Sequence, residues 1–213
     1  MGTSNKVLTD ILKVFQDILK IDYNELTSFL DSKGLLPNGG TGGGGSNTNK
    51  NGLCYEKLTE LNTEYSVLDS SKHFKKIKFE EDESIEFIKT DRTHLFKYLD
   101  EYVDKKIKKA HGCKVPDECY INENTKTIFI IEKKFQNCGG SVCEKIQTSD
   151  FKIWQYCRTF PNHKIVYIYC LSEWFRLNCV AELEYLEEKK NMVFWGNNEN
   201  YKKELVNFIV NYK

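Results

Sequence analysis

Two stretches of β-branched and aromatic residues constrain the fold of this chain more than any other feature. They cover residues 126–135, with the run TIFIIEKKF from Thr127, and residues 164–171, KIVYIYCL. The first is apolar on both faces at its start, and the second is strongly apolar throughout, as is typical of buried central strands. The core is therefore expected to form around a sheet that contains both stretches.

The segments around these strands alternate between helical and extended patterns. Helices are expected over about 93–109, 142–160, 173–190 and 199–212, and further strands over 118–122 and 192–195. In the second helix, Phe151, Trp154 and Cys157 are among the expected apolar positions. Upstream, the patterns indicate a helix at Tyr55–Leu61, an edge strand at 72–79 and a short strand at 85–88. This order predicts an α/β fold with a mixed central β-sheet flanked by helices.

The composition changes abruptly before this region. Residues 1–37 show helical periodicity from residue 6, which predicts a small N-terminal helical segment. Residues 38–52 read NGGTGGGGSNTNKNG and are interpreted as a Gly-rich linker or loop, because they hold almost no apolar surface to bury. Residues 53–213 then form the α/β domain.

The charge of the chain gives no global attraction to nucleic acid. Lys and Arg total 31, as do Asp and Glu, so a polyanionic partner requires lysines that are clustered locally. No apolar run is long enough to span a bilayer, and residues 1–22 interleave charges with apolar positions, unlike a secretory signal. We therefore expect a soluble, intracellular (cytoplasmic) protein with no membrane partner.

Two acids and a lysine are expected to converge at one end of the sheet. Asp117 follows Pro116 at the start of the first strand of a hairpin, and Glu132 and Lys134 end the second. Residues two apart on a strand share a face, so Glu132 and Lys134 point the same way. Charges at the edge of a core are costly unless they are paired or bind a metal. Carboxylates suit Mg²⁺, and the lysine can stabilise charge on a phosphate.

The signature Pro116-Asp117…Glu132-x-Lys134 resembles that of the PD-(D/E)XK nuclease superfamily, which includes many type II restriction endonucleases. The resemblance covers about 93–171 and implies a restriction endonuclease-like core. It implies Mg²⁺, for which Mn²⁺ can substitute, held by Asp117, Glu132 and the main-chain carbonyl of Lys133, with a catalytic role for Lys134. It further implies cleavage of double-stranded DNA, in the manner of a site-specific type II restriction endonuclease, by a homodimer.

Accessory residues remain open. Some members of the superfamily add an acid from the helix before the first strand, for which Glu101, Asp100 and Asp104 are candidates. In the segment after Lys134, the candidates are Glu144, Lys145 and Gln147. For each one, the competing interpretation is an exposed position on an amphipathic helix.

The chain has 8 cysteines, and no disulfide framework is expected because no signal peptide is apparent. Cys157, Cys170 and Cys179 are interpreted as small core residues. Cys113, Cys119, Cys138 and Cys143 lie near the expected site, so a zinc or iron–sulfur centre is an alternative, although their spacing is unlike that of common zinc sites.

Two other functions compete with restriction. One is a repair or recombination nuclease. The other is a non-catalytic DNA- or protein-binding module, for which the basic segments KHFKK at 72–76 and KKIKK at 105–109 are candidate contacts. Only a nuclease depends on Mg²⁺ and on Glu132.

Overall fold

The computed structural model describes residues 46–103, 109–137 and 142–212. The chain divides into two units, Met1–Cys54 and Tyr55–Lys213. The sheet and all of the expected site residues belong to the second unit. Residues 104–108 and 138–141 of this unit, and with them Asp104 and Cys138, lie outside the described residues. The expected helices before residue 37 also lie outside them.

The described residues form one seven-stranded sheet in the order β1-β2-β3-β4-β5-β6-β7. The strands are β1 (Tyr65–Ser70), β2 (Lys75–Phe79), β3 (Asp82–Thr90), β4 (Glu118–Asn122), β5 (Thr127–Lys134), β6 (Lys164–Leu171) and β7 (Met192–Trp195). Pairing is antiparallel from β1 to β5 and parallel from β5 to β7. The expected mixed sheet is confirmed, and the two apolar stretches form the adjacent strands β5 and β6 within it.

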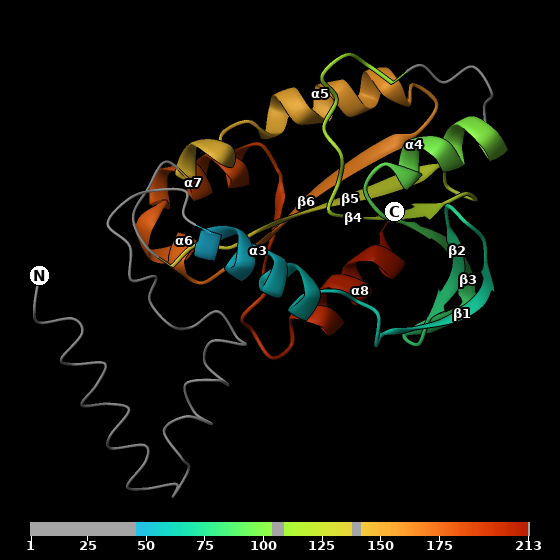
Figure 1. Cartoon of the computed structure of the whole chain (residues 1–213), viewed down its shortest axis with the longest axis horizontal. Helices are drawn as coiled ribbons and strands as arrows, with labels where there is room; N and C mark the ends of the chain where they lie inside the picture. The colour runs from blue at the N-terminus through green and yellow to red at the C-terminus, as the bar shows by residue number, and fades with distance from the viewer. Residues whose placement is uncertain (1–45, 104–108, 138–141, 213) are drawn as a thin grey trace, which may run out of the picture. The chain divides into compact units, whose positions relative to one another are not determined.

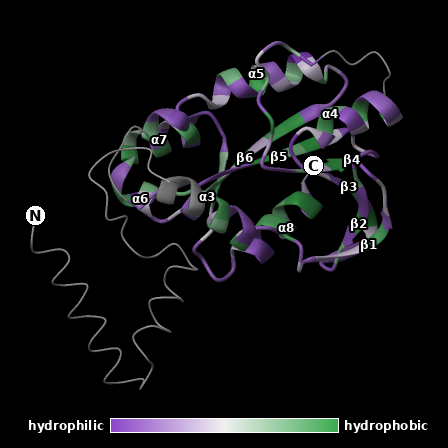
Figure 2. Ribbon diagram, viewed as in Figure 1, coloured by the Kyte–Doolittle hydropathy of each residue, from purple (hydrophilic) through white to green (hydrophobic). Residues whose placement is uncertain are grey.

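Helices cover both faces of this sheet (Figure 1). They are α4 (His94–Tyr98), α5 (Ser149–Thr159), α6 (Trp174–Asn178), α7 (Val180–Glu188) and α8 (Tyr201–Asn211), with a π-helical turn η1 (Leu99–Val103) and a 3₁₀ turn η2 (Cys143–Lys145). A further helix, α3 (Ser46–Leu58), crosses the boundary between the two units. One core cluster joins α4, α5, α6 and α7 to one face, through residues such as Ile130 and Tyr169. The other joins α8 and Tyr55 to the opposite face, through Phe129 and Ile168. Figure 2 shows apolar residues along the central strands β5 and β6.

Several boundaries differ from the expected ones. The expected edge strand is β2, which lies between β1 and β3, and β1 itself was not anticipated. Residues 46–52, expected in the linker, begin α3. Poor helix formers can extend a helix because adding a residue costs less than nucleating one. The expected helix at 93–109 is only α4 followed by η1 over its described part.

The face that α5 presents to the sheet also differs from the expected one. Phe151, Trp154 and Cys157 were expected to be apolar positions of the core, but all three are exposed. The buried side chains of this helix include Ser149, Gln155, Tyr156 and Thr159. A hydroxyl or amide group on the inner face can replace an apolar one if it is hydrogen-bonded, as Thr159 is to the carbonyl of Gln155 at 2.8 Å.

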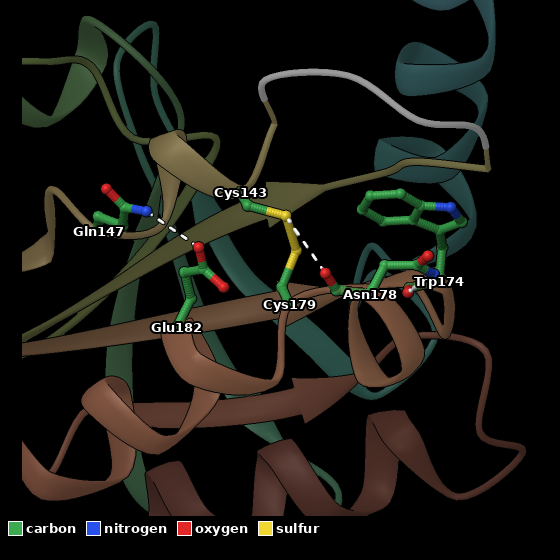
Figure 3. The surroundings of a disulfide bond; sticks show 6 residues. All are labelled: Cys143, Gln147, Trp174, Asn178, Cys179 and Glu182. Carbon is green, nitrogen blue, oxygen red and sulfur yellow. Dashed lines mark hydrogen bonds between the residues drawn. A yellow bond between two sulfur atoms is a disulfide. The ribbon is translucent and has the colours of Figure 1, made fainter.

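A disulfide between Cys143 and Cys179 corrects two of the cysteine interpretations (Figure 3). It links η2 to the junction of α6 and α7, at a Cα–Cα distance of 5.9 Å and across 36 positions of sequence. The expected single helix at 173–190 is interrupted at Cys179, one residue before α7 begins. Cys170 is buried, as expected. No helix in the described part of the chain is long and apolar enough to cross a membrane.

We expect Cys143→Ser combined with Cys179→Ser to lower the free energy of unfolding by about 2–4 kcal/mol, because the cross-link restricts the unfolded chain. Urea denaturation under non-reducing conditions measures this change, and dithiothreitol should produce the same shift in the parent protein. Cys157→Ser is the matched control, since this thiol is free and exposed. An unchanged midpoint after complete reduction would contradict the expectation.

Candidate active site

The hairpin of β4 and β5 brings Asp117 beside Glu132. Glu118, the first residue of β4, pairs with Ile131 of β5, so the start of one strand meets the end of the other. The main-chain N–H of Lys133 donates a hydrogen bond to Asp117 Oδ2 at 2.8 Å. This bond fixes the aspartate against the strand that carries the other two predicted residues.

The ammonium group of Lys134 lies among three oxygen atoms. It is 2.7 Å from Glu132 Oε1 and 3.7 Å from Asp117 Oδ2. It also donates a hydrogen bond to the main-chain carbonyl of Lys133 at 3.0 Å. The PD-(D/E)XK resemblance implies these same three groups as metal ligands, and in the structure all three lie around one ammonium group.

A second ammonium group reaches this cluster from α5. Lys152 Nζ is 3.1 Å from Glu132 Oε1, and both side chains are about nine-tenths buried. Lys152 was not among the predicted accessory residues. The sequence marks Lys152 as one of several polar residues in this segment next to the expected site, and the rotation of α5 turns its side chain toward Glu132.

The electrostatic balance differs between the two acids. Burial tends to raise the pKa of Glu132, but the neighbouring charges of Lys134 and Lys152 outweigh burial, and the pKa lies below its ordinary value. Burial raises the pKa of Asp117, and Glu132 adds to this effect against the opposing charge of Lys134. Burial tends to lower the pKa of Lys134, yet Glu132 and Asp117 keep it above the ordinary value. Neighbouring cations therefore compensate the negative charge of Glu132 well and that of Asp117 poorly.

A third acid, Glu56, belongs to the same electrostatic neighbourhood. It lies in the last turn of α3, where the preceding Tyr55 is buried and its hydroxyl is 3.4 Å from Cys170 Sγ. Burial raises the pKa of Glu56, with the negative charge of Asp117 as the next cause, while Arg92 pairs with it at 3.1 Å. No local motif marks Glu56, because only the folded chain brings α3 to this end of the sheet.

An open pocket of about 750 Å³ contains the cluster. Asp117, Glu132, Lys134 and Lys152 line it, together with the predicted accessory residues Glu144, Lys145 and Gln147 and with Lys114. Gln147 Nε2 also donates a hydrogen bond to Glu182 Oε1 at 2.9 Å (Figure 3). The pocket therefore holds four lysines alongside three acids, and two of these lysines, Lys134 and Lys152, are paired with Glu132.

The predicted acids before the first strand of the hairpin lie elsewhere. Glu101 on η1 is 3.6 Å from His73 Nε2 and does not line the pocket. Asp100 is exposed on the same turn, and Asp104 lies outside the described residues. After Tyr98 the helix continues as the π-helical turn η1, which carries both Asp100 and Glu101.

The thiols do not assemble the alternative metal centre. Cys113 and Cys119 are buried and free, Cys143 is bonded to Cys179, and Cys138 lies outside the described residues. The described residues contain one group of three His, Cys, Asp or Glu side chains whose possible ligand atoms lie close together, formed by Cys143, Cys179 and Glu182. Its two sulfur atoms are bonded to each other, so they do not act as two thiolate ligands.

The oxygen cluster does fit a hard cation. Two carboxylates and a main-chain carbonyl are the ligand types that Mg²⁺ and Mn²⁺ prefer, and the three oxygens already converge on one positive charge. Those oxygens cannot hold both the ammonium and a divalent ion, because the two charges repel. The flexible stem of Lys134 allows the ammonium to move aside.

Comparisons with protein-family models, with curated proteins and with solved structures give no match to this chain.

In the metal-free protein, we expect Asp117→Asn to stabilise the fold at neutral pH. The raised pKa of Asp117 means that its ionised form is less favourable in the folded state than in the unfolded state. The gain in the free energy of unfolding should be full at pH values above the raised pKa of Asp117. It should disappear below the ordinary pKa of an aspartate, where the carboxyl group is protonated in both the folded and the unfolded state. Urea denaturation at pH 7 and at about pH 3.5, with EDTA present, tests this, and a gain that is equal at both pH values would contradict it.

Proposed function

We propose that this chain is a Mg²⁺-dependent endonuclease that hydrolyses phosphodiester bonds in DNA. The observation that carries the proposal is the convergence of Asp117 Oδ2, Glu132 Oε1 and the Lys133 carbonyl on one ammonium group, 2.7 to 3.7 Å away. This arrangement supports an ion-binding site beside at least two lysines in an open pocket.

The residues of the pocket have distinct expected roles. A bound Mg²⁺ supplies polarisation of the phosphoryl group and lowers the pKa of a coordinated water. Asp117 and Glu132 hold the negative charge that attracts the ion, and Lys152 keeps Glu132 ionised and in place. Lys134 supplies positive charge for the phosphate as charge builds up in the transition state. Lys114 and Lys145, both exposed on the wall, attract the strand backbone.

The surrounding elements are consistent with the PD-(D/E)XK resemblance. The order α4, β4, β5, α5, β6 follows the helix–strand–strand–helix–strand arrangement expected of that core. Glu56 replaces Glu101 as the candidate for the additional acid, and it too comes from a helix that precedes strands of the sheet. A site-specific restriction enzyme acting as a homodimer on double-stranded DNA is the finer form of this proposal, with a repair or recombination nuclease as its alternative.

A non-catalytic binding module is the competing function, and one observation favours it. Lys134 and Lys152 already compensate Glu132, so the cluster can serve as a buried ion-pair network without any metal. In that case the protein would bind nucleic acid equally well with and without Mg²⁺.

Incubation of the full chain with supercoiled plasmid and with linear phage DNA, in Mg²⁺ and in EDTA, tests the proposal. We expect nicking or linearisation in Mg²⁺ that EDTA abolishes. Discrete fragments of the linear DNA would indicate site-specific cleavage, and a smear would indicate a nuclease without sequence preference. Intact DNA under all conditions, at protein concentrations that saturate binding, would reject the nuclease and favour the binding module.

A further inference from the structure

Two aromatic side chains on α5 lie in solvent. Phe151 is 59% exposed and Trp154 is 52% exposed. Their rings stack with centroids 5.6 Å apart and an interplanar angle of 22°. The guanidinium of Arg158 lies 5.1 Å from the centre of the Trp154 ring. Because residues three and four apart share a helix face, these three side chains form one continuous surface, named here the aromatic platform.

The core of the protein does not require the aromatic platform. The opposite side of α5 supplies the packing, through Tyr156, which is 1% exposed, and Thr159. Two large neighbouring rings in water lose the hydrophobic stabilisation that burial would give, and such exposed patches usually mark a binding surface. A planar ring flanked by a guanidinium presents both a stacking face and a positive charge.

The charges around the platform suit a polyanion. The His111–Val115 segment lies against α5, since Tyr156 Oη donates a hydrogen bond to the Lys114 carbonyl at 3.0 Å and Gln155 Nε2 donates one to the His111 carbonyl at 3.3 Å. This segment contains no acid. The acid of α5, Asp150, is 2.9 Å from Lys189 Nζ, just after the end of α7, and also accepts a hydrogen bond from the hydroxyl of Tyr185 in α7, so its charge is compensated.

The platform continues from the pocket. Thr148 is exposed, lines the pocket at the beginning of α5 and is three residues before Phe151 on the same side of the helix, whereas Lys152 lines the pocket from the side that faces the sheet. Trp154 and Arg158 extend the same surface by roughly one and two further turns. Lys114, which lines the pocket, is in the segment that packs on this helix. A strand whose phosphate lies in the pocket therefore meets the aromatic platform by way of Thr148 and Phe151.

We propose that Phe151 and Trp154 stack with unpaired bases of a nucleic-acid strand that passes through the pocket. The substrate would then include a single-stranded portion next to the phosphodiester bond, because the bases of a continuous duplex are stacked on each other and do not offer their faces. This inference favours the repair or recombination form of the proposed nuclease over the restriction form. This inference rests on the proposed nuclease function for the chemistry of the pocket. The binding surface itself can be tested without cleavage.

Binding of a fluorescein-labelled single-stranded oligothymidine, measured by anisotropy in EDTA, tests the platform. We expect Phe151→Ala combined with Trp154→Ala to weaken binding roughly tenfold or more, because each stacked base contributes substantially. Binding of a duplex of the same length should change little. The oligonucleotide should also quench tryptophan emission in the parent protein, and Trp154→Phe should remove most of that quenching while retaining binding.

Leu177→Ala on α6 is the matched control, since Leu177 is a 78% exposed apolar residue. Equal single-strand affinity in the parent and in the Phe151/Trp154 double variant would overturn the proposal. So would a parent dimer, seen by sedimentation, that the double variant loses without any change in single-strand binding, because the surface would then be an interface between two copies. If the platform binds single strands but Mg²⁺ produces no cleavage, the nuclease function fails while the binding surface stands.

Discussion

Replacing Glu132 with glutamine is expected to reduce Mg²⁺-dependent cleavage of plasmid DNA by on the order of 10³-fold or more. Loss of the carboxylate charge removes one of the two acidic groups that converge with the Lys133 carbonyl. A bound metal contributes several kcal/mol to stabilising the transition state, and about 1.4 kcal/mol corresponds to a factor of ten in rate. Glutamine preserves the size of the side chain and an oxygen that accepts hydrogen bonds from Lys134 and Lys152.

The rate of supercoiled plasmid nicking measures this effect, and titration calorimetry with Mn²⁺ measures ion binding separately. Glu86→Gln is the matched control, because Glu86 is an acid on β3 that is paired with Lys76 and does not line the pocket. We expect it to leave both measurements unchanged. Nicking by the Glu132→Gln protein at the parent rate would remove Glu132 from the chemistry and sink the assignment of the site.

The centre of the fold could be predicted from the sequence because its signals are local. The buried strands β5 and β6 are nearly continuous runs of apolar residues, and the alternation along a strand places Glu132 and Lys134 on one face. The short turn that joins β4 to β5 then determines that Asp117 meets them. Three of the site groups follow from one hairpin, without knowledge of the rest of the chain.

Other parts of the site depend on contacts between distant segments. Glu56 reaches the neighbourhood of Asp117 through the packing of α3, which local spacing does not encode. The rotation of α5 differs from the expected one because hydrophobic periodicity assumes that large apolar residues point inward. In the structure, the side chains of α5 that point toward the sheet include Tyr156, Thr159 and Lys152, and Lys152 pairs there with Glu132.

The two faces of β5 carry separate ion pairs with different consequences. Lys134 and Glu132 face the open pocket, whereas Lys133 points to the other side, where its ammonium is 2.7 Å from Glu118 Oε2. Both side chains of this second pair are 2% exposed. Tyr120 donates a hydrogen bond to the other oxygen of Glu118, and Lys133 also donates one to the Glu56 carbonyl at 3.1 Å. The pair therefore ties β4, β5 and the end of α3 together beneath the site.

Lys133→Met is consequently expected to lower the free energy of unfolding by about 3–5 kcal/mol, because it leaves the buried charge of Glu118 without its cation. Urea denaturation at pH 7 measures the loss. Lys126→Met is the matched control, since Lys126 forms an exposed pair with Glu123 at 2.7 Å, for which about 0–1 kcal/mol is expected.

Adding Glu118→Leu to Lys133→Met should recover much of the loss, because the unpaired charge is then gone. A Lys133→Met protein as stable as the Lys126→Met protein would show that Glu118 does not depend on this partner. Since the main-chain carbonyl of residue 133 remains, the folded Lys133→Met protein should still cleave DNA in Mg²⁺, which separates the role of this side chain in stability from the proposed chemistry on the other face of the strand.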